Sequence, residues 1–386
     1  MFKLLGAQPG IELSVFAGPG EGSLESAGGE EHFLHVRAAI SSYRVGRAQM
    51  YYQRAQIEVV DPERFDLVIL PWNTRLLTLG AGLRRARRRE LPIALWGHGY
   101  SKRQRRPMRW LRNRMARMAD AVLLYSHGVA RRLIEEFGFD PRCVFVAQNA
   151  LDQAQIKEAV RRWTSDPKAL PTFQRKHDVD PAQTVIFVSR LEPQNRVEML
   201  IRGMQCLQRS RPAAKMVIVG QGSQRSALET LAAELGQADR VIFTGAIYEE
   251  SQLAPWMLSA TLFCYPVNIG LSLLHAFGFG LPVVTSDDIP SHNPEIEALE
   301  PGVNGLLYRD GDVQHMVAQW LRLMDDPVMR DRLGANARRQ VSENYSLAKM
   351  VQGFLDLTSI VDGERRVVQP IAQDLAANQS PEDCVS

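Results

Sequence analysis

Short apolar runs recur along the chain and alternate with stretches in which apolar residues return every three or four positions. The first series contains "IELSVFAG", "FDLVILPW", "LPIALWGHG", "AVLLYS" and "CVFVAQNA", and the second contains "TVIFVSRL", "AKMVIVGQG", "RVIFTGAI", "ATLFCYPV" and "LPVVTSD". Continuous apolar runs are typical of buried parallel strands, and the longer period is typical of amphipathic helices. The pattern therefore predicts an α/β fold with two Rossmann-like domains that face each other across a cleft.

A polar segment, "RRWTSDPKALPTFQRKHDVDPAQ", separates the two series and reads as a linker followed by a domain start. We therefore expect a first domain over residues 1–165 and a second over 166–344. A helix over 345–362 can cross back to the first domain, and a polar, flexible tail follows over 363–386. Because "MFKLLGAQPG" reads as the end of a helix, we expect the first domain to lack its opening strand.

Composition narrows the class of protein. The 386 residues are 45% hydrophobic and 23% charged, as in soluble globular proteins. Neither an apolar run of membrane-spanning length nor the pattern of a signal peptide is present, so we expect a cytoplasmic protein. The cysteines have no metal-ligand or redox spacing and are expected to be reduced. They are Cys143, Cys206, Cys264 and Cys384.

The basic residues concentrate in one stretch. Between Arg84 and Arg117 there are thirteen Lys or Arg residues and one acid, Glu90. Helical spacing there predicts an apolar face of Met108, Leu111, Met115 and Met118 with Trp110 beside it, and a basic face of Arg109, Arg112, Arg114 and Arg117. Each basic residue near anionic lipid contributes about 1 kcal/mol, so we expect binding to an anionic membrane surface. An ordinary surface helix packed on the core stays open. Nucleic acid is not expected, because no recognition motif accompanies the arginines.

Three loops of the second series carry residues suited to phosphate. Arg190 follows the run "TVIFVS", Gly220 and Gly222 follow "MVIV", and Gly270 precedes the apolar helix "LSLLHAFG". The carboxyl ends of parallel strands meet at one edge of a sheet, so these loops should lie close together. A guanidinium clamps phosphate oxygens, and the free N–H groups of a helix start attract anions. A surface arginine and a tight glycine turn remain the alternatives.

Five segments carry a resemblance to a known family. They are "SRLEPQNRVEMLIRGM", "VIVGQGSQRSALETLA", "VIFTGAI", "NIGLSLLHAFGFGLPVVTSD" and "PEIEALEPGVNGLLYRDGD". In order and spacing they resemble the GT-B glycosyltransferases of family 4, or group 1, and "GHG" and "VAQNALD" extend the likeness into the first half. The resemblance implies transfer of a sugar from a UDP- or GDP-linked donor to a saccharide or lipid-linked saccharide. It also implies a retained anomeric configuration and no cofactor or metal.

The resemblance assigns roles to individual residues. Arg190 would bind the donor diphosphate, and the amides of Ile269, Gly270, Leu271 and Ser272 would hold phosphate and sugar oxygens. His98 would face the transferred sugar, so His98 and Arg190 are the expected catalytic residues. The other expected donor-binding residues are Asn195, Arg196, Gly220, Gly222, Asn268, His275 and Glu295.

The chain departs from the family at three positions. Relatives usually carry two glutamates separated by seven residues, and those positions are Val267 and His275 here. Asn195 stands where a lysine is usual, with Arg196 next to it. Neutral imidazole offers a donor and an acceptor, so His275 can still hydrogen-bond to a ribose hydroxyl. The candidates for the sugar contact of the missing first glutamate are Asp287, Asp288 and His292.

We expect front-face retaining transfer in exopolysaccharide or O-antigen assembly, by a protein peripheral to the inner face of the cytoplasmic membrane. A non-catalytic GT-B protein that binds nucleotide, lipid or a partner transferase stays open, because the missing glutamates and lysine would suit it. A nicotinamide-dependent oxidoreductase would share the Rossmann-like domains. The sequence does not favour it, because no G-x-G-x-x-G follows a strand with an acid about twenty residues further on.

Overall fold

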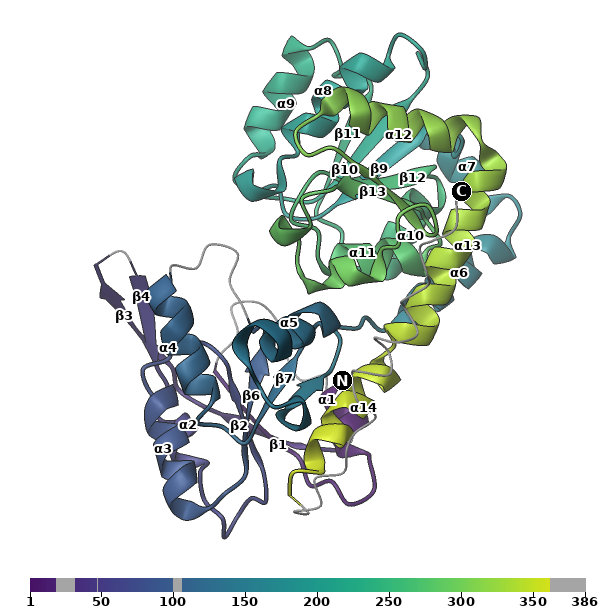
Figure 1. The fold of residues 1–386 in the computed structure, drawn as a ribbon. Coiled ribbons are helices and arrows are strands. Elements are labelled where there is room, and N and C mark those ends of the chain that lie inside the picture. Colours follow the sequence, from purple (N-terminus) through teal and green to yellow (C-terminus); the bar gives the residue numbers. More distant parts are fainter. Residues whose placement is uncertain (19–31, 47, 100–105, 362–386) are drawn as a thin grey trace, which may run out of the picture. The chain divides into compact units, whose positions relative to one another are not determined.

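The computed structural model describes residues 1–18, 32–46, 48–99 and 106–361. It divides into two compact units (Figure 1). The first unit is Met1–Gln148 together with the chain from Leu347 onward, and the second is Asn149–Ser346. The flexible tail expected over 363–386 lies outside the described residues. Each unit is an α/β structure with a parallel sheet, as the alternating pattern predicted.

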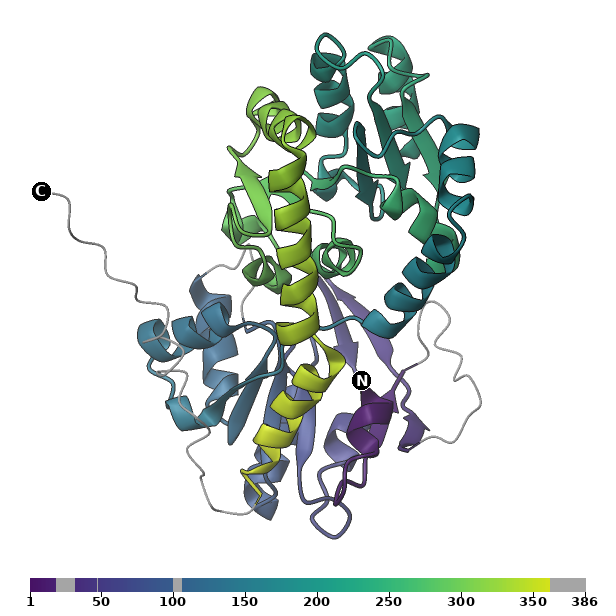
Figure 2. The same ribbon diagram turned by 90° about the vertical axis from the view of Figure 1, so that its right-hand side faces the viewer.

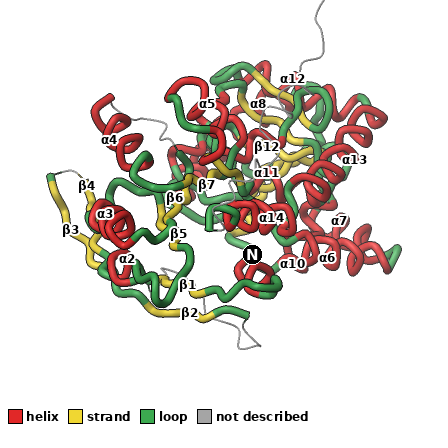
Figure 3. The backbone as a smooth tube through the Cα atoms, turned by 60° about the horizontal axis from the view of Figure 1, so that its bottom comes forward, coloured by secondary structure: helices red, strands yellow, loops and turns green. Residues whose placement is uncertain are grey.

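The first unit is built on a parallel sheet of order β5-β6-β7-β8. Its helices are α1 (Phe2–Gly6), α2 (Ala55–Glu58), α3 (Leu79–Arg89), α4 (Arg106–Ala116), α5 (His127–Phe137) and α14 (Leu347–Thr358). Its strands are β1 (Ser14–Ala17), β2 (Leu34–Arg37), β3 (Ser41–Val45), β4 (Ala48–Tyr52), β5 (Val68–Pro71), β6 (Ile93–Gly97), β7 (Ala121–Leu124) and β8 (Val144–Val146). The parallel pair β1–β2 and the antiparallel pair β3–β4 are separate from the main sheet. Helices α2 and α3 pack on each other (Figure 3).

Helix α14 closes the first unit. It packs against α1 and against strands β7 and β8, and Figure 2 shows α1 and α14 side by side. The contact depends on Gly353, because a Cβ atom there would lie 2.2 Å from the carbonyl oxygen of Val146. The last helix therefore holds the carboxyl-terminal segment on the first unit, although the chain before it belongs to the second unit.

The second unit is a six-stranded parallel sheet of order β11-β10-β9-β12-β13-β14. Its strands are β9 (Thr184–Val188), β10 (Lys215–Val219), β11 (Val241–Gly245), β12 (Leu262–Tyr265), β13 (Val283–Ser286) and β14 (Gly305–Tyr308). Its helices are α6 (Gln153–Ser165), α7 (Ala169–His177), α8 (Glu198–Leu207), α9 (Arg225–Glu234), α10 (Glu250–Leu258), α11 (Leu271–Gly278), α12 (Val313–Asp325) and α13 (Pro327–Asn344). Helices α8 and α12 pack together, as do α11 and α13, and the core between helices and sheet includes the fully buried Phe187, Phe263, Phe277 and Trp320.

The structure differs from the predicted domain boundary and from the predicted linker. The chain changes units at Gln148, not at residue 165, and the segment expected to be a linker is mostly helix, in α6 and α7. Helix α6 buries Ile156 and Ala159 against the second unit, and the indole N–H of Trp163 donates to the carbonyl of Ser251 at 2.8 Å. A narrow apolar face is enough to pack this polar helix against the second unit. The charged residues on its other faces made the segment resemble a loop in the sequence.

Helix α4 forms within the basic stretch, and its expected apolar face is covered only in part, because Met115 and Met118 pack against the core. Arg112, Asn113 and Ala116 are buried, whereas Met108 and Leu111 are exposed. The Arg112 guanidinium lies 5.6 Å from the centre of the Trp72 ring, so a long aliphatic stem and a cation–π contact allow this arginine to be buried beside the methionines. Residues 100–105 of the basic stretch lie outside the described residues. None of the described helices is long and apolar enough to span a membrane.

Candidate functional site

The candidate site lies at the carboxyl edge of the second unit's sheet. Strand β9 is hydrogen-bonded between β10 and β12, and all three run parallel. The loop after β9 carries Arg190, the loop after β10 carries Gly220 and Gly222, and the loop after β12 leads through Gly270 into α11. The sheet topology therefore brings these predicted residues to the same edge.

Gly220 and Gly222 allow two loops to cross in contact. A Cβ atom on Gly220 would lie 1.9 Å from the Ser189 carbonyl oxygen, and one on Gly222 would lie 2.4 Å from that of Leu191. The Leu191 N–H donates to the Gln221 carbonyl at 2.9 Å across the same crossing. Chain packing is therefore sufficient to explain the two glycines, and the loop that carries Arg190 is fixed by its neighbour.

Three asparagines join the Arg190 loop to the loop before α11. The side-chain amide of Asn195 donates to the Arg190 carbonyl at 2.7 Å, and Asn268 Nδ2 donates to Asn195 Oδ1 at 3.1 Å. Asn293 Nδ2 in turn donates to the Asn268 carbonyl at 3.1 Å. Asn195 is buried, and its side-chain nitrogen and oxygen are both hydrogen-bonded within the protein. It therefore positions the backbone of Arg190, whereas we had predicted that it contacts the donor directly.

One of the four amides predicted to hold the donor is already bound. The N–H of Ile269 donates to His292 Nδ1 at 3.2 Å, and His292 Nε2 donates to the Ser286 carbonyl at 3.0 Å. His292 is fully buried and therefore braces the loop, so it does not replace the missing first glutamate. The prediction that the Ile269 amide binds phosphate is wrong for this arrangement, because its hydrogen is engaged by imidazole.

The next three amides remain available. Among the described residues no acceptor lies on the N–H groups of Gly270, Leu271 or Ser272, at the start of α11. Gly270 has a φ of −138°, so the backbone conformation at this position is not left-handed and does not itself require a glycine. It is needed for space, because a Cβ atom would lie 2.9 Å from Asn293 Nδ2. An anion at this helix start would meet three N–H groups and the positive end of the helix dipole.

The basic residues differ in their partners. Arg196 Nη1 lies 3.0 Å from both carboxylate oxygens of Asp310, so it is not a free replacement for the family's lysine. The Ser223 hydroxyl and amide donate to Glu192 and hold the pKa of that carboxyl below its usual value. Arg190 is exposed and forms no ion pair with any described residue. Arg190 also lies within electrostatic reach of Tyr265, at the end of β12.

The two positions of the family's glutamates are occupied in different ways. Val267 is 4% exposed and belongs to the buried interior. His275 Nε2 lies 3.0 Å from Glu250 Oε2, and its ring lies 5.5 Å from that of Phe279. His275 thus has a protein partner on α10, which its place in the sequence did not reveal. Neither position presents a carboxylate of its own.

Glu295 is a buried carboxylate with one free oxygen. The side chain is 4% exposed, and Oε1 accepts a hydrogen bond of 2.6 Å from Asn149 Nδ2. Oε2 has no partner in the part of the chain that the structure describes. Asn149 is the first residue of the second unit, so Glu295 ties the start of that unit to the helical turn Pro294–Ala298. The hydrogen bond with Asn149 gives Glu295 a structural role in addition to the predicted donor contact.

His98 belongs to the first unit. It follows strand β6 directly, its side chain is exposed, and its ring centre lies 4.8 Å from that of Tyr125. The structure places it at the carboxyl end of its own sheet, the position from which side chains reach ligands in open α/β sheets.

Sequence reasoning missed several residues that shape the site. They are Asn149, Glu250, Asn293 and Asp310. Each is far along the chain from the residue it contacts. Asn149 and Asp310 lie in segments that carry the family resemblance, but the resemblance gave these two residues no role. The usable signal was a carboxylate or amide directly after a predicted strand, and that signal fits only Asn149 and Asp310.

Comparison with known proteins agrees with this geometry. Residues 171–340 match the family model described as glycosyl transferases group 1, and residues 6–155 match the model for glycosyltransferase family 4. The chain is 26% identical over 282 residues to a GDP-mannose-dependent alpha-(1-6)-phosphatidylinositol monomannoside mannosyltransferase of Mycolicibacterium smegmatis, covering 70% of each chain. It is 27% identical over 259 residues to a related mannosyltransferase of Corynebacterium glutamicum, covering 64% of this chain and 63% of that one.

Solved structures show the same fold. Anabaena Alr3699/HepE in complex with UDP aligns with a TM-score of 0.63 at 19% identity, over 80% of this chain and 82% of that one. Sucrose-phosphate synthase of Thermosynechococcus elongatus aligns with a TM-score of 0.64 at 17% identity, over 94% and 92%. At these identities the solved structures show that the chain has the GT-B fold. The two family models together cover most of the chain and show that it belongs to the group 1, family 4 glycosyltransferases, enzymes that use nucleotide-sugar donors.

Proposed function

We propose that the donor is a UDP- or GDP-linked sugar whose diphosphate binds between Arg190 and the start of α11. The observation that carries this proposal is that two adjoining loops bring together an exposed arginine that forms no ion pair with a described residue and three amides that donate to no described acceptor. One side supplies a bidentate charged donor and the other a helix dipole, and both favour a dianionic group. Relatives named for GDP-mannose and a similar structure that holds UDP support this donor class.

The proposed reaction is retaining transfer on one face of the sugar. The bond from the anomeric carbon to the diphosphate oxygen breaks, and the anomeric carbon forms a new bond to the acceptor hydroxyl on the same face. The acceptor proton passes to the departing phosphate oxygen. Arg190 and the amides of Gly270, Leu271 and Ser272 stabilise the negative charge that develops there. No side-chain nucleophile takes part, and His98 assists by hydrogen-bonding to the transferred sugar.

The acceptor we propose is a saccharide or lipid-linked saccharide in exopolysaccharide, O-antigen or related glycan assembly. The relatives that act on a phosphatidylinositol mannoside support a lipid-linked class. The direct test is turnover of UDP-glucose and GDP-mannose with a lipid-linked saccharide, followed by NMR of the new linkage. An α-linked product from these α-linked donors supports the proposal. A product of inverted configuration contradicts it.

We also propose that the first unit docks on an anionic membrane face. Helix α4 exposes Trp110 and Met108 beside its arginines, the combination that lies in membrane interfaces. Sedimentation with anionic vesicles should show binding that weakens as salt screens the surface potential. Equal binding to neutral vesicles would contradict an electrostatic origin.

A further inference from the structure

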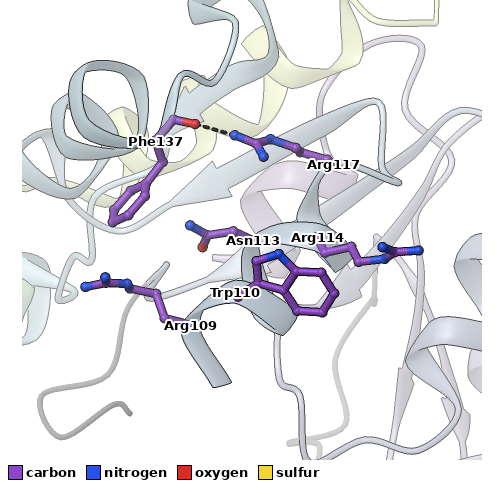
Figure 4. Close-up of a pocket in the computed structure, with 6 residues that line it drawn as sticks. All are labelled: Arg109, Trp110, Asn113, Arg114, Arg117 and Phe137. Carbon is purple, nitrogen blue, oxygen red and sulfur yellow. Dashed lines mark hydrogen bonds between the residues drawn. The ribbon is translucent and has the colours of Figure 1, made fainter. Parts of the chain in front are cut away.

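A hollow of about 430 Å³ lies in the first unit, beside α4 and the end of α5. Its lining residues are Arg109, Trp110, Asn113, Arg114, Arg117 and Phe137. Figure 4 shows the indole of Trp110 and the guanidinium groups around it, with Arg117 bonded to the Phe137 carbonyl. Every lining residue belongs to the first unit, so the hollow is separate from the donor site proposed in the second.

The arginines of the hollow are held in place without being neutralised. The Arg109 guanidinium lies 5.5 Å from the centre of the Phe137 ring, and that of Arg114 lies 5.3 Å from the Trp110 ring. Neither arginine, nor Arg117, forms an ion pair with a carboxylate of the described residues. Aromatic faces orient a guanidinium and leave its charge uncompensated. Three like charges around one hollow favour an anionic occupant.

Two buried polar side chains of α4 narrow the class of ligand further. Asn113 is 7% exposed, lines the hollow, and its Oδ1 accepts from no described donor. Arg112 is 6% exposed, and its Nε donates to no described acceptor. Burial, with the nearby charges of Arg109 and Arg132, lowers the pKa of Arg112 to about 10. Buried polar atoms are normally paired, so an unpaired acceptor beside unpaired cations indicates a ligand with both a donor and a negative charge.

We propose that this hollow binds a phosphate ester that carries a hydroxyl group near the phosphate. The phosphate accepts hydrogen bonds from Arg109 and Arg117, which lie on the same side of the hollow as Asn113 (Figure 4), and the hydroxyl donates to Asn113 Oδ1. The carbon skeleton of the ligand lies along the exposed indole of Trp110. A free phosphorylated polyol and the headgroup of a membrane lipid share this chemistry, and the two are separated by experiment.

The test uses the full chain and the fluorescence of Trp110, identified as the signal that is lost in Trp110→Phe. Glycerol 3-phosphate is one probe, phosphatidylglycerol vesicles are the second, and inorganic phosphate is the comparator. At least one of the two probes should change the signal, and the one that does so identifies the ligand as a free phosphorylated polyol or a lipid headgroup. Inorganic phosphate should bind more weakly, because it lacks the ester's hydroxyl. Arg109→Gln with Arg117→Gln should weaken binding at least about tenfold, since charge-assisted hydrogen bonds are lost.

The matched control is Arg87→Gln with Arg88→Gln, which removes the same charge from exposed positions of α3 outside the hollow. This variant should bind both probes as the parent does. The proposal is overturned if neither probe changes the signal, if the Arg109 and Arg117 variant binds unchanged, or if the control loses as much. Repeating the titration in Arg190→Ala should give the parent result, because Arg190 lies in the other unit, so the donor-site proposal stands or fails separately.

Discussion

His275 Nε2 lies 3.0 Å from Glu250 Oε2, and the two side chains are only 16% and 25% exposed. The pair joins α11 to the first turn of α10, so the histidine that stands in place of a family glutamate has an acid supplied by another helix. The carboxylate that the family resemblance leads us to expect at residue 275 is absent, and the imidazole there is paired with the carboxylate of residue 250. The pair makes a prediction about reversion.

His275→Glu should destabilise the second unit, because two carboxylates would then face each other where an acid and an imidazole now pair. We expect a loss of about 1 to 3 kcal/mol in the free energy of unfolding, the usual cost of leaving a buried polar group unpaired. Urea unfolding of the variant and the parent measures it.

The control is His275→Glu combined with Glu250→Gln, in which an amide can donate to the new carboxylate. Most of the lost stability should return. If His275→Glu alone is as stable as the parent, then the contact with Glu250 contributes nothing and a stabilising role of the pair is contradicted.

Gly222→Ala should destabilise the crossing of the loops after β9 and β10. The new Cβ would lie 2.4 Å from the Leu191 carbonyl oxygen, which cannot move without displacing the Arg190 loop. We expect a loss of about 1 to 3 kcal/mol, typical of overpacking, together with weaker donor binding. Thermal unfolding and calorimetric titration measure the two effects.

Gly80→Ala is the matched control for the glycine substitution. Gly80 lies in α3, and a Cβ there meets only ordinary contacts, the nearest at 3.8 Å. Alanine should stabilise that helix by up to about 1 kcal/mol because it lowers the entropy of the unfolded chain. Equal destabilisation by both substitutions would argue against the crossing as the cause.

Arg112→Met should stabilise the first unit, because methionine keeps the aliphatic packing on Trp72 and removes a buried, unpaired charge. Replacing buried charges by apolar residues often stabilises proteins by about 1 to 4 kcal/mol, and we expect the lower part of that range. Urea unfolding of the variant and the parent measures the gain.

The pH dependence of that gain follows from the pKa of Arg112, which burial lowers to about 10 in the folded chain, well below its ordinary value. Above pH 10 the unfolded chain binds more protons than the folded chain, so the stability of the parent rises with pH there. The advantage of Arg112→Met should be constant below pH 10 and should shrink above it. An advantage that stays the same through that range would contradict the assigned cause.

The sequence could predict the second unit's sheet because its strands are continuous apolar runs. Strand β9 is an example, with four of its five residues buried on both faces of a parallel sheet. Helix α6 was missed because its fixed face is narrow, with Ile156, Ala159 and Trp163 set among charged residues. The placing of Arg112 on an exposed basic face of α4 was wrong. Hydrophobicity ranks Arg112 as exposed, but the ring of Trp72 accommodates it.

The sequence predicted which loops form the site, but it did not predict the hydrogen bonds of individual atoms in them. Arg190 and Gly270 could be placed at one edge, because parallel strands share a carboxyl end. The engagement of the Ile269 amide could not, because its acceptor, His292, is buried after an intervening helix and strand. The same holds for Arg196, whose partner Asp310 follows the edge strand β14. Short-range spacing carries no information on such partners.

The central claim is that the donor diphosphate lies between Arg190 and the start of α11, and calorimetric titration with UDP-glucose and GDP-mannose tests it most directly. Arg190→Ala should weaken binding of the accepted donor about ten- to a hundredfold, because a charge-assisted contact contributes roughly 1.5 to 3 kcal/mol. Arg202→Ala, which removes an exposed arginine from α8, should bind as the parent does. If folded Arg190→Ala binds the accepted donor as tightly as the parent, the diphosphate lies elsewhere and the account is contradicted.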